Sequence, residues 1–272
     1  MEENMTTQYE TLLVDVTGHV ATVTLNRPDV RNAFNETMIA DVTAAFTALG
    51  ARDDVRAIVL AGSGKAFCAG ADLNWMRKMA GYSDEENRAD AMRLAAMLSA
   101  VYRCPKPVIA RVHGDAYAGG MGLVCTADIV VAAQTANFCL SEARLGLMPA
   151  TIAPYVIRAL GEQASRRYFV TAEVFDCASA QRLGLVSEAV SAEELDASVA
   201  RIAQTLAANS PNAVRECKQL VQDVAGQTID HALIEDTALR IARIRASAEG
   251  RDGVSSFLEK RTPGWRSQAA AS

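Results

Sequence analysis

Twice in this chain a short apolar segment runs into a loop of small residues and then into a helical pattern. The segments Val55–Ala61 and Val108–Val112 have the length and composition of buried strands. Glycine- and alanine-rich loops follow them, near Ala71 and near Gly120. Glycines at the start of a helix leave backbone N–H groups that a ligand can approach closely. Each loop therefore either binds an anion, polarises a carbonyl oxygen or only turns the chain.

The rest of the chain places these two units in an α/β architecture. The alternating segments Leu12–Val16 and Val20–Leu25 flank a Thr-Gly-His turn, which predicts a β-hairpin. Ser83 and Glu86 have the spacing of a capping box and predict the start of a long helix. Strands and helices alternate over roughly two-thirds of the chain, and the last 60 or so residues read as helices only. We therefore predict an α/β core with a helical appendage.

Composition limits the partners that this chain can have. Its formal net charge of −5 offers no general attraction to nucleic acid or to an anionic membrane. No apolar run approaches the roughly 20 residues that span a bilayer, and the N-terminal segment lacks the features of a secretory signal. The six cysteines form no Cys-x-x-Cys pair and have no histidine at metal-binding spacing. We expect a cytoplasmic protein with reduced, mostly buried cysteines and no metal site.

The two small-residue loops suggest a shared chemical role. Two backbone N–H groups from separate loops can converge on one oxygen and form an oxyanion hole, which is worth about 3–4 kcal/mol per donor. Neither loop is a nucleotide-binding fingerprint, because the run Gly119–Gly122 lacks the G-x-G-x-x-G spacing and no Walker A sequence is present. A Gly-x-Ser-x-Gly nucleophile elbow is also absent.

Glu142 is the strongest candidate for moving protons. It lies among apolar residues such as Leu140 and Leu145, where desolvation would raise the pKa of its carboxyl group. The alternative is an exposed glutamate at a helix start. The histidines His19, His113 and His231 are isolated in the sequence, and a structural role is expected for each.

Six segments of the chain, in this order, resemble the crotonase, or enoyl-CoA hydratase/isomerase, superfamily. They are Asn26–Phe34, Ala66–Leu73, His113–Asp128, Ser141–Pro149, Ala180–Val186 and Phe257–Arg261. The resemblance implies a crotonase-like spiral of ββα units over residues 1–205, which would contain the coenzyme A site and the active site. It also implies that residues 206–272 form a helical trimerisation region, and that the chain forms a homotrimer or a hexamer built as a dimer of trimers.

The resemblance also implies roles for individual residues. The N–H groups of Ala71 and Gly120 would hold the thioester oxygen of an acyl-CoA, and Glu142 would be the catalytic carboxylate. The residues implied to border coenzyme A are Arg27, Ala69, Asp72 and Leu73, joined by Phe257 and Lys260 from the C-terminal helix. No cofactor would be bound permanently, since coenzyme A arrives as part of the substrate.

One position departs from the family pattern. Hydratases of this family carry a first glutamate two residues after the second oxyanion-hole donor, and this chain has Gly122 there. The departure leaves three readings open. The chain is a hydratase with one catalytic glutamate, an isomerase that moves a 3-double bond to the 2-position, or a catalytically silent acyl-CoA-binding scaffold. Some relatives bind RNA, but the acidic net charge opposes that reading.

The local sequence around Gly120 and Glu142 resembles a bacterial subgroup assigned to 3-methylglutaconyl-CoA hydratase. This resemblance implies a branched enoyl-CoA with a distal carboxylate, as in the breakdown of leucine-type branched-chain acids. We therefore expect an enoyl-CoA hydratase in which Glu142 handles the proton at the α-carbon and the space beside Gly122 orients water. Arg144 or Arg77 would pair with the distal carboxylate; the alternative for each is a surface ion pair.

Overall fold

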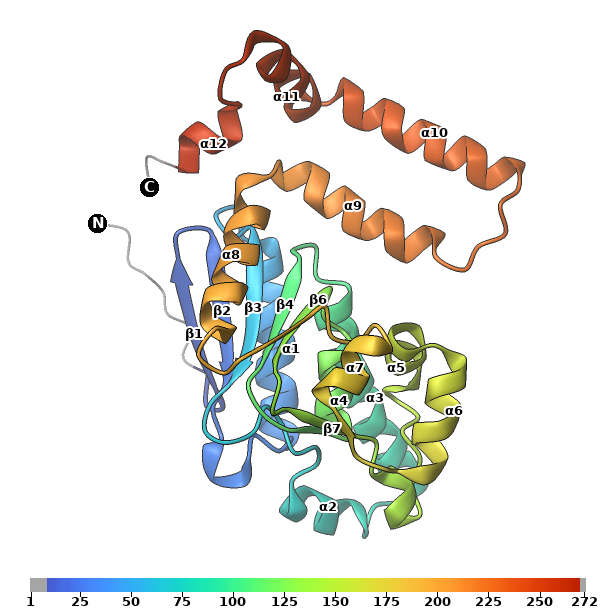
Figure 1. Cartoon of the computed structure of the whole chain (residues 1–272). Helices are drawn as coiled ribbons and strands as arrows, with labels where there is room; N and C mark the ends of the chain where they lie inside the picture. The colour runs from blue at the N-terminus through green and yellow to red at the C-terminus, as the bar shows by residue number, and fades with distance from the viewer. Residues whose placement is uncertain (1–8, 270–272) are drawn as a thin grey trace.

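A six-stranded sheet forms the centre of the fold (Figure 1). The computed structural model describes residues 9–269. From edge to edge the sheet consists of β1 (Leu12–Thr17), β2 (Val20–Leu25), β3 (Ala57–Gly62), β4 (Val108–Val112), β6 (Ile129–Ala133) and β9 (Glu188–Val190). Strands β1 and β2 form the predicted antiparallel hairpin, and the later neighbours pair in parallel. β3 and β4 are almost entirely buried, as is typical of central parallel strands.

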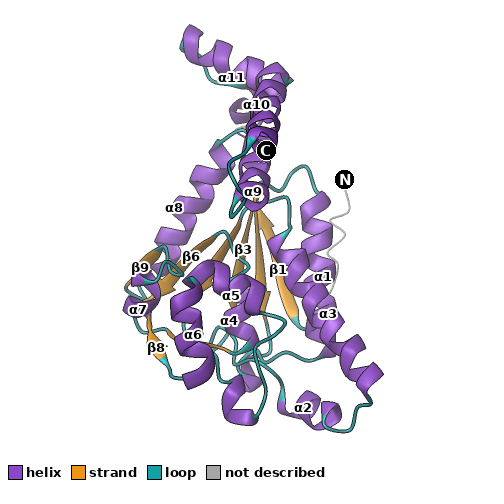
Figure 2. Ribbon diagram, turned by 90° about the vertical axis from the view of Figure 1, so that its right-hand side faces the viewer, coloured by secondary structure: helices purple, strands orange, loops and turns teal. Residues whose placement is uncertain are grey.

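Helices cover both faces of this sheet. α1 (Glu36–Ala51) and α3 (Asp84–Tyr102) pack against each other on one face, while α8 (Leu195–Ala208) contacts β3, β4 and β6 on the other (Figure 2). The predicted capping box of α3 is confirmed. The Ser83 amide donates to Glu86 Oε2 at 2.8 Å, and the Glu86 amide donates to Ser83 Oγ at 3.3 Å. The predicted α/β core is therefore present, and its long helix α3 begins where the sequence placed it.

A second, three-stranded sheet was not predicted from the sequence. It consists of β5 (Ala116–Tyr117), β7 (Asn137–Cys139) and β8 (Phe175–Asp176). Strands of two or three residues are too short to show a periodic apolar pattern. The helices around this sheet are α4 (Gly119–Val124), α5 (Ala153–Leu160), α6 (Glu162–Thr171) and α7 (Cys177–Arg182). The small sheet aligns the segments that carry the candidate site.

The C-terminal region is an extended helical arm. It consists of α9 (Pro211–Val224), α10 (His231–Ala246), α11 (Ala248–Glu259) and α12 (Gly264–Ala269), so the prediction of helices only is confirmed up to residue 269. Lys218 of α9 joins the arm to the core through an ion pair with Asp128 at 2.7 Å. Within the described chain, neither α9 nor α10 has a buried residue. The predicted division at residue 205 falls inside α8.

Candidate active site

Three segments that are distant in the sequence meet at the candidate site. A bridge pairs Phe34 with Ala71, and a second bridge pairs Cys68 with Ala116. The amide of Tyr117 donates to the Cys68 carbonyl at 2.9 Å. These backbone bonds hold the loop before α2 (Leu73–Met79) against the strand β5 that leads into α4. The two small-residue loops identified in the sequence are therefore adjacent in space.

The N-terminus of α4 presents free backbone N–H groups. Gly119 and Gly120 are its first two residues, and neither amide has a hydrogen-bond partner within residues 9–269. Ala118, immediately before them, has a φ of 49° and a ψ of −123°, a backbone conformation that is strained for a residue with a Cβ. Its amide donates to the Cys139 carbonyl at 2.8 Å, which holds it in place. Strain of this kind is typical of functional turns.

Ala71 supplies another free amide. The Phe34 amide donates to the Gly70 carbonyl at 2.7 Å, and the Asp72 amide donates to the Phe34 carbonyl at 2.8 Å. In this parallel bridge the polar groups of Ala71 face away from Phe34, and its amide has no partner among the described residues. An ideal Cβ built on Gly70 would lie 3.8 Å from the Gly119 nitrogen, so the Ala71 loop approaches α4 at that amide.

Glu142 follows the strand β7, which holds the turn before α4. It begins the short 3₁₀ helix η2 (Glu142–Leu145), three residues after Cys139, whose carbonyl receives the Ala118 amide. Burial raises the pKa of the Glu142 carboxyl group above its ordinary value, although a hydrogen bond to its own backbone amide opposes the shift. Its Oε2 atom is buried and has no hydrogen-bond partner in the described chain. This carboxylate oxygen is thus available to accept a proton.

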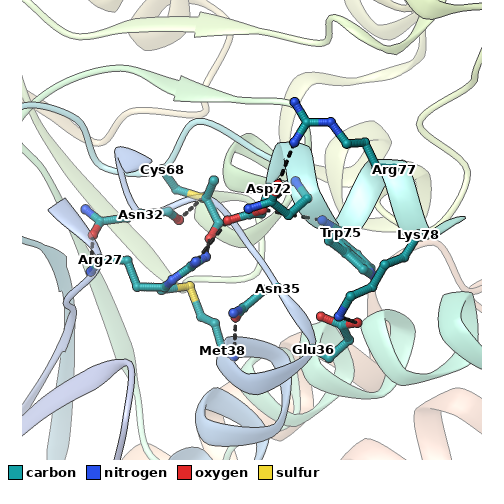
Figure 3. Close-up of polar contacts among 12 residues, drawn as sticks. Arg27, Asn32, Asn35, Glu36, Met38, Cys68, Asp72, Trp75, Arg77 and Lys78 are labelled. Atoms are coloured by element: carbon teal, nitrogen blue, oxygen red, sulfur yellow. Dashed lines mark hydrogen bonds and ion pairs between the residues drawn. The ribbon is translucent and has the colours of Figure 1, made fainter. Parts of the chain in front are cut away.

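A charged pair fixes the Ala71 loop from the other side (Figure 3). Arg27 donates to Asp72 Oδ2 at 2.9 Å and to the Ala33 carbonyl at 2.6 Å. Asp72 also caps α2, accepting the amides of Asn74 at 2.7 Å and Trp75 at 3.4 Å. Burial by itself raises the pKa of Asp72, but these amides and Arg27 outweigh burial, so that its pKa is lowered.

The loop is expected to be sensitive to changes at Asp72. Asp72→Ala should lower the free energy of unfolding by about 2–4 kcal/mol, because it removes a helix cap and leaves the Arg27 charge unpaired. Asp72→Asn retains the capping oxygen and should cost less. Since the native pKa is lowered, the contribution of Asp72 is present above the ordinary carboxyl pKa and is lost as the pH falls through the lowered value. Urea unfolding at neutral and acidic pH measures both effects, and equal stability of Asp72→Ala and the unmodified protein would contradict this assignment.

The space beside Gly122 is not open. An ideal Cβ built on Gly122 would lie 2.1 Å from Cγ2 and 2.5 Å from Cβ of Ile152. Ile152 is 2% exposed and belongs to the main hydrophobic core. The expectation that this space orients a water molecule is therefore wrong, because an apolar side chain fills it.

The two arginines predicted to meet a distal carboxylate differ in position. Arg144 follows Glu142 in η2, and its guanidinium donates to the Ala172 carbonyl at 2.5 Å. Arg77 lies on the exposed side of α2 and donates to Asn74 Oδ1 at 2.5 Å (Figure 3). Neither forms an ion pair with a carboxylate of residues 9–269, so the surface ion pair expected as the alternative is not present. Of the two, only Arg144 belongs to the same element as Glu142.

Phe257 and Lys260 are not brought to this site by their own chain. Phe257 belongs to α11 and is 83% exposed, and Lys260 ends that helix. Both views place α11 at the opposite end of the molecule from α2, which follows the Ala71 loop (Figures 1 and 2). The resemblance implied that these two residues border coenzyme A together with Arg27 and Leu73. A single chain does not bring them together in this way.

Two residues of the site were missed from the sequence. Ala118 adopts the strained turn, and Ile152 fills the space beside Gly122. Gly119, which adds a free amide next to Gly120, was indicated by the adjacent glycines at the helix start. No local pattern links Ile152 to Gly122, because the two residues are far apart in the sequence.

Other kinds of site are not found in the part of the chain that the structure describes. Residues 9–269 contain no group of three or more His, Cys, Asp or Glu side chains that could hold a metal ion. In the same range no helix is long and apolar enough to cross a membrane. Five cysteines are buried, as expected, while Cys217 is exposed.

Comparison with known proteins identifies the family of this chain. Residues 15–268 match the family model described as enoyl-CoA hydratase/isomerase. The structure is similar to that of an enoyl-CoA hydratase from Shewanella pealeana, with a TM-score of 0.92 and 42% identity over 95% of this chain and 97% of the other. An enoyl-CoA hydratase from Mycobacterium smegmatis gives a TM-score of 0.89 and 38% identity over 94% and 99%. The enoyl-CoA hydratase ACTT6 of Alternaria alternata is 33% identical over 86% of this chain and 77% of its own length.

Proposed function

Because this chain belongs to the enoyl-CoA hydratase/isomerase family, we propose that it adds water reversibly across the 2,3 double bond of an enoyl-CoA. One observation carries the proposal: the buried, unpartnered Oε2 of Glu142 belongs to the segment after β7, and the Cys139 carbonyl of β7 holds the turn before the free amides of α4. A carboxylate and an oxyanion hole are the two groups that an enolate-forming reaction needs.

A single carboxylate can complete the hydration. Glu142 takes a proton from water as the water oxygen bonds to C3 of the enoyl group. The electron pair of the C2–C3 double bond moves toward C1 and places negative charge on the thioester oxygen. Protonated Glu142 then returns the proton to C2, which restores the C1 carbonyl and gives a 3-hydroxyacyl thioester. The raised pKa of Glu142 brings it closer to neutral pH, where a group can both accept and donate a proton.

The amides of Ala71 and Gly120 would stabilise the charge on the thioester oxygen. Each preorganised donor of this kind contributes about 3–4 kcal/mol when the charge develops. Gly119 offers an adjacent donor at the same helix terminus. The coenzyme A portion would run along Arg27, Ala69, Asp72 and Leu73, where the Arg27–Asp72 pair keeps the loop in one conformation. Coenzyme A is then part of the substrate rather than a resident cofactor.

For the acyl group we propose a branched enoyl chain with a distal carboxylate, such as 3-methylglutaconyl-CoA in leucine-type degradation. The rim next to Glu142 supports this choice. Leu147 and Met148 are 57% and 77% exposed there, which gives an apolar surface for a branched chain. Arg144, in the same turn, has no carboxylate partner in the described chain and uses one nitrogen for the Ala172 carbonyl. Its remaining N–H groups can pair with the carboxylate of a substrate. Arg77 is the other arginine proposed for this role.

We also propose that residues 206–272 assemble the chain into a homotrimer or a hexamer. α10 is a 16-residue helix without a buried residue in the described chain. Its apolar side chains Ile234, Leu239 and Ile241 are each about half exposed. Exposed apolar side chains that gather on one helix are often covered by a partner. A neighbouring copy could also bring Phe257 and Lys260 to the coenzyme A path.

The expected mass in solution is three or six times the 29.0 kDa of the chain. Sedimentation or light scattering measures it. Replacing Leu239 and Ile241 together with aspartate should shift the population toward monomer by at least about tenfold, because two buried charges would cost several kcal/mol. A monomeric unmodified protein would contradict the proposal.

A second function is favoured by one observation. Ile152 fills the space beside Gly122 and leaves an apolar wall, which suits an isomerase that moves a 3-double bond to the 2-position with Glu142 as its sole carboxylate. In that reaction Glu142 carries a proton from C2 to C4, and no water is added.

Product masses distinguish the two functions. The protein is incubated with 2-enoyl and 3-enoyl thioesters, with and without a methyl branch and a distal carboxylate. Hydration raises the product mass by one water, and isomerisation leaves it unchanged. A protein that binds these thioesters without converting any of them would be an acyl-CoA-binding scaffold. Filter binding with RNA, run in parallel, tests the nucleic-acid alternative.

A further inference from the structure

We propose that Ile152 is the specificity-determining residue that restricts this site to one carboxylate. Its side chain occupies the space that any side chain at position 122 would need, since its Cγ2 and Cβ lie 2.1 and 2.5 Å from an ideal Cβ on Gly122. Distances below 3.0 Å require a shift of the packing. Gly122 and Ile152 therefore pack as a pair, because the missing side chain of the glycine leaves the space that the isoleucine fills.

Position 122 is placed to influence the reaction. The Gly122 amide donates to the Ala118 carbonyl at 3.1 Å, so it lies one helical turn beyond the strained residue. Side chains of a helix lean toward its N-terminus. A side chain at position 122 would thus lean toward the free amides of Gly119 and Gly120. A carboxylate there could hold and activate a water molecule next to the reacting carbons.

Ile152 is held rigidly in that space. It is the N-cap residue of α5, and α5 packs against α4. Ile152 is 2% exposed and shares the main core with Met121, from α4, and Leu140, two residues before Glu142. Because protein cores are close-packed, a buried side chain such as Ile152 cannot turn aside without disturbing its neighbours. An apolar surface therefore occupies the place where a second proton-transfer group would otherwise lie.

This inference rests on the proposed function and narrows its substrate class. With the wall apolar, no side chain at position 122 orients the attacking water. The site then favours enoyl thioesters that carry their own polar group within reach of the double bond, such as a distal carboxylate. Unsubstituted enoyl thioesters should be turned over more slowly.

The test combines two positions. Gly122→Ala adds only the clashing Cβ and should lower Tm by about 5–10 °C. Ile152→Gly removes both contacting atoms, and glycine is accepted at an N-cap. The double variant Gly122→Glu/Ile152→Gly should have a higher Tm than the value obtained by adding the Tm changes of Gly122→Glu and Ile152→Gly, each measured alone. Ile152→Val keeps Cβ and Cγ2, so it should give no such recovery with Gly122→Glu.

Activity provides the second readout. Relative to Ile152→Gly alone, the Gly122→Glu/Ile152→Gly protein should hydrate an unsubstituted enoyl-CoA at least about tenfold faster and gain another ionisation in its pH–rate profile. Strict additivity in Tm, or an unchanged pH profile in a folded double variant, would overturn the proposal. The Tm changes at positions 122 and 152 could be non-additive although no variant hydrates any thioester. That result would contradict the proposed hydratase function but would support the packing of Ile152 against position 122. The pH profile is then read from isomerisation.

Discussion

Replacing Glu142 with glutamine is expected to lower kcat/KM for the thioester substrate by about 10²–10⁴-fold. The amide has nearly the shape of the carboxylate, but it cannot accept a proton from water or from C2. Substrate binding should be almost unchanged, because the loops that hold coenzyme A do not involve this side chain. Initial rates with a 2-enoyl-CoA, together with thioester binding by calorimetry, measure both quantities.

The raised pKa of Glu142 gives this prediction a pH dependence. Activity requires the ionised carboxylate, so the rate should rise with pH through that raised pKa. The native protein holds its proton to higher pH than the unfolded chain does. The contribution of Glu142 to stability is therefore greatest at low pH and declines as pH rises through the native pKa.

Stability separates a catalytic Glu142 from a structural one. Glu142→Gln removes the cost of burying a charge, so its Tm near neutral pH should equal or exceed that of the unmodified protein. A fall in Tm that parallels the loss of activity would mean that Glu142 supports the fold instead. Retention of near-normal turnover by Glu142→Gln would contradict the mechanism itself.

Gly120→Ala is expected to have the second large effect, with a loss of about 10²–10³-fold in kcat. An ideal Cβ at this position would lie 2.4 Å from the Cys68 carbonyl oxygen and 2.7 Å from Cys68 Cβ. That oxygen accepts the Tyr117 amide at 2.9 Å and cannot move independently of the bridge between the two loops. The first turn of α4 must shift instead, which displaces its amides from the thioester oxygen. Overpacking should also lower the free energy of unfolding by about 1–3 kcal/mol.

Gly119→Ala is the matched control. The added Cβ would meet Phe34 Cε2 at 3.0 Å, which is a side-chain atom at the edge of a ring rather than backbone. A small ring movement relieves that contact, so the losses in stability and rate should be smaller than those of Gly120→Ala. Rates at saturating substrate and chemical unfolding compare the two variants. Equal effects at the two glycines would show that the close approach of Cys68 is not what fixes the amides.

Much of the fold was predictable because its signals are local. The hairpin β1–β2 follows from alternating residues, and α3 begins at the capping box of Ser83 and Glu86. The family model and the similar solved structures confirm the crotonase-like fold that the resemblance implied. The strands of the small sheet escaped prediction because two or three residues carry no period, although they bring Ala118 next to Cys139.

The sequence by itself determined which segments could carry chemistry: two small-residue loops and a glutamate among apolar neighbours. Tertiary structure alone decided what surrounds them. It set the Ala71 loop against the strand that leads into α4 and placed Ile152 in the space beside Gly122. It also put α11 at the opposite end of the molecule from α2. The reason is physical. Periodicity and capping depend on residues a few positions apart, whereas the packing around Gly122 and Glu142 depends on segments that meet only when the core closes.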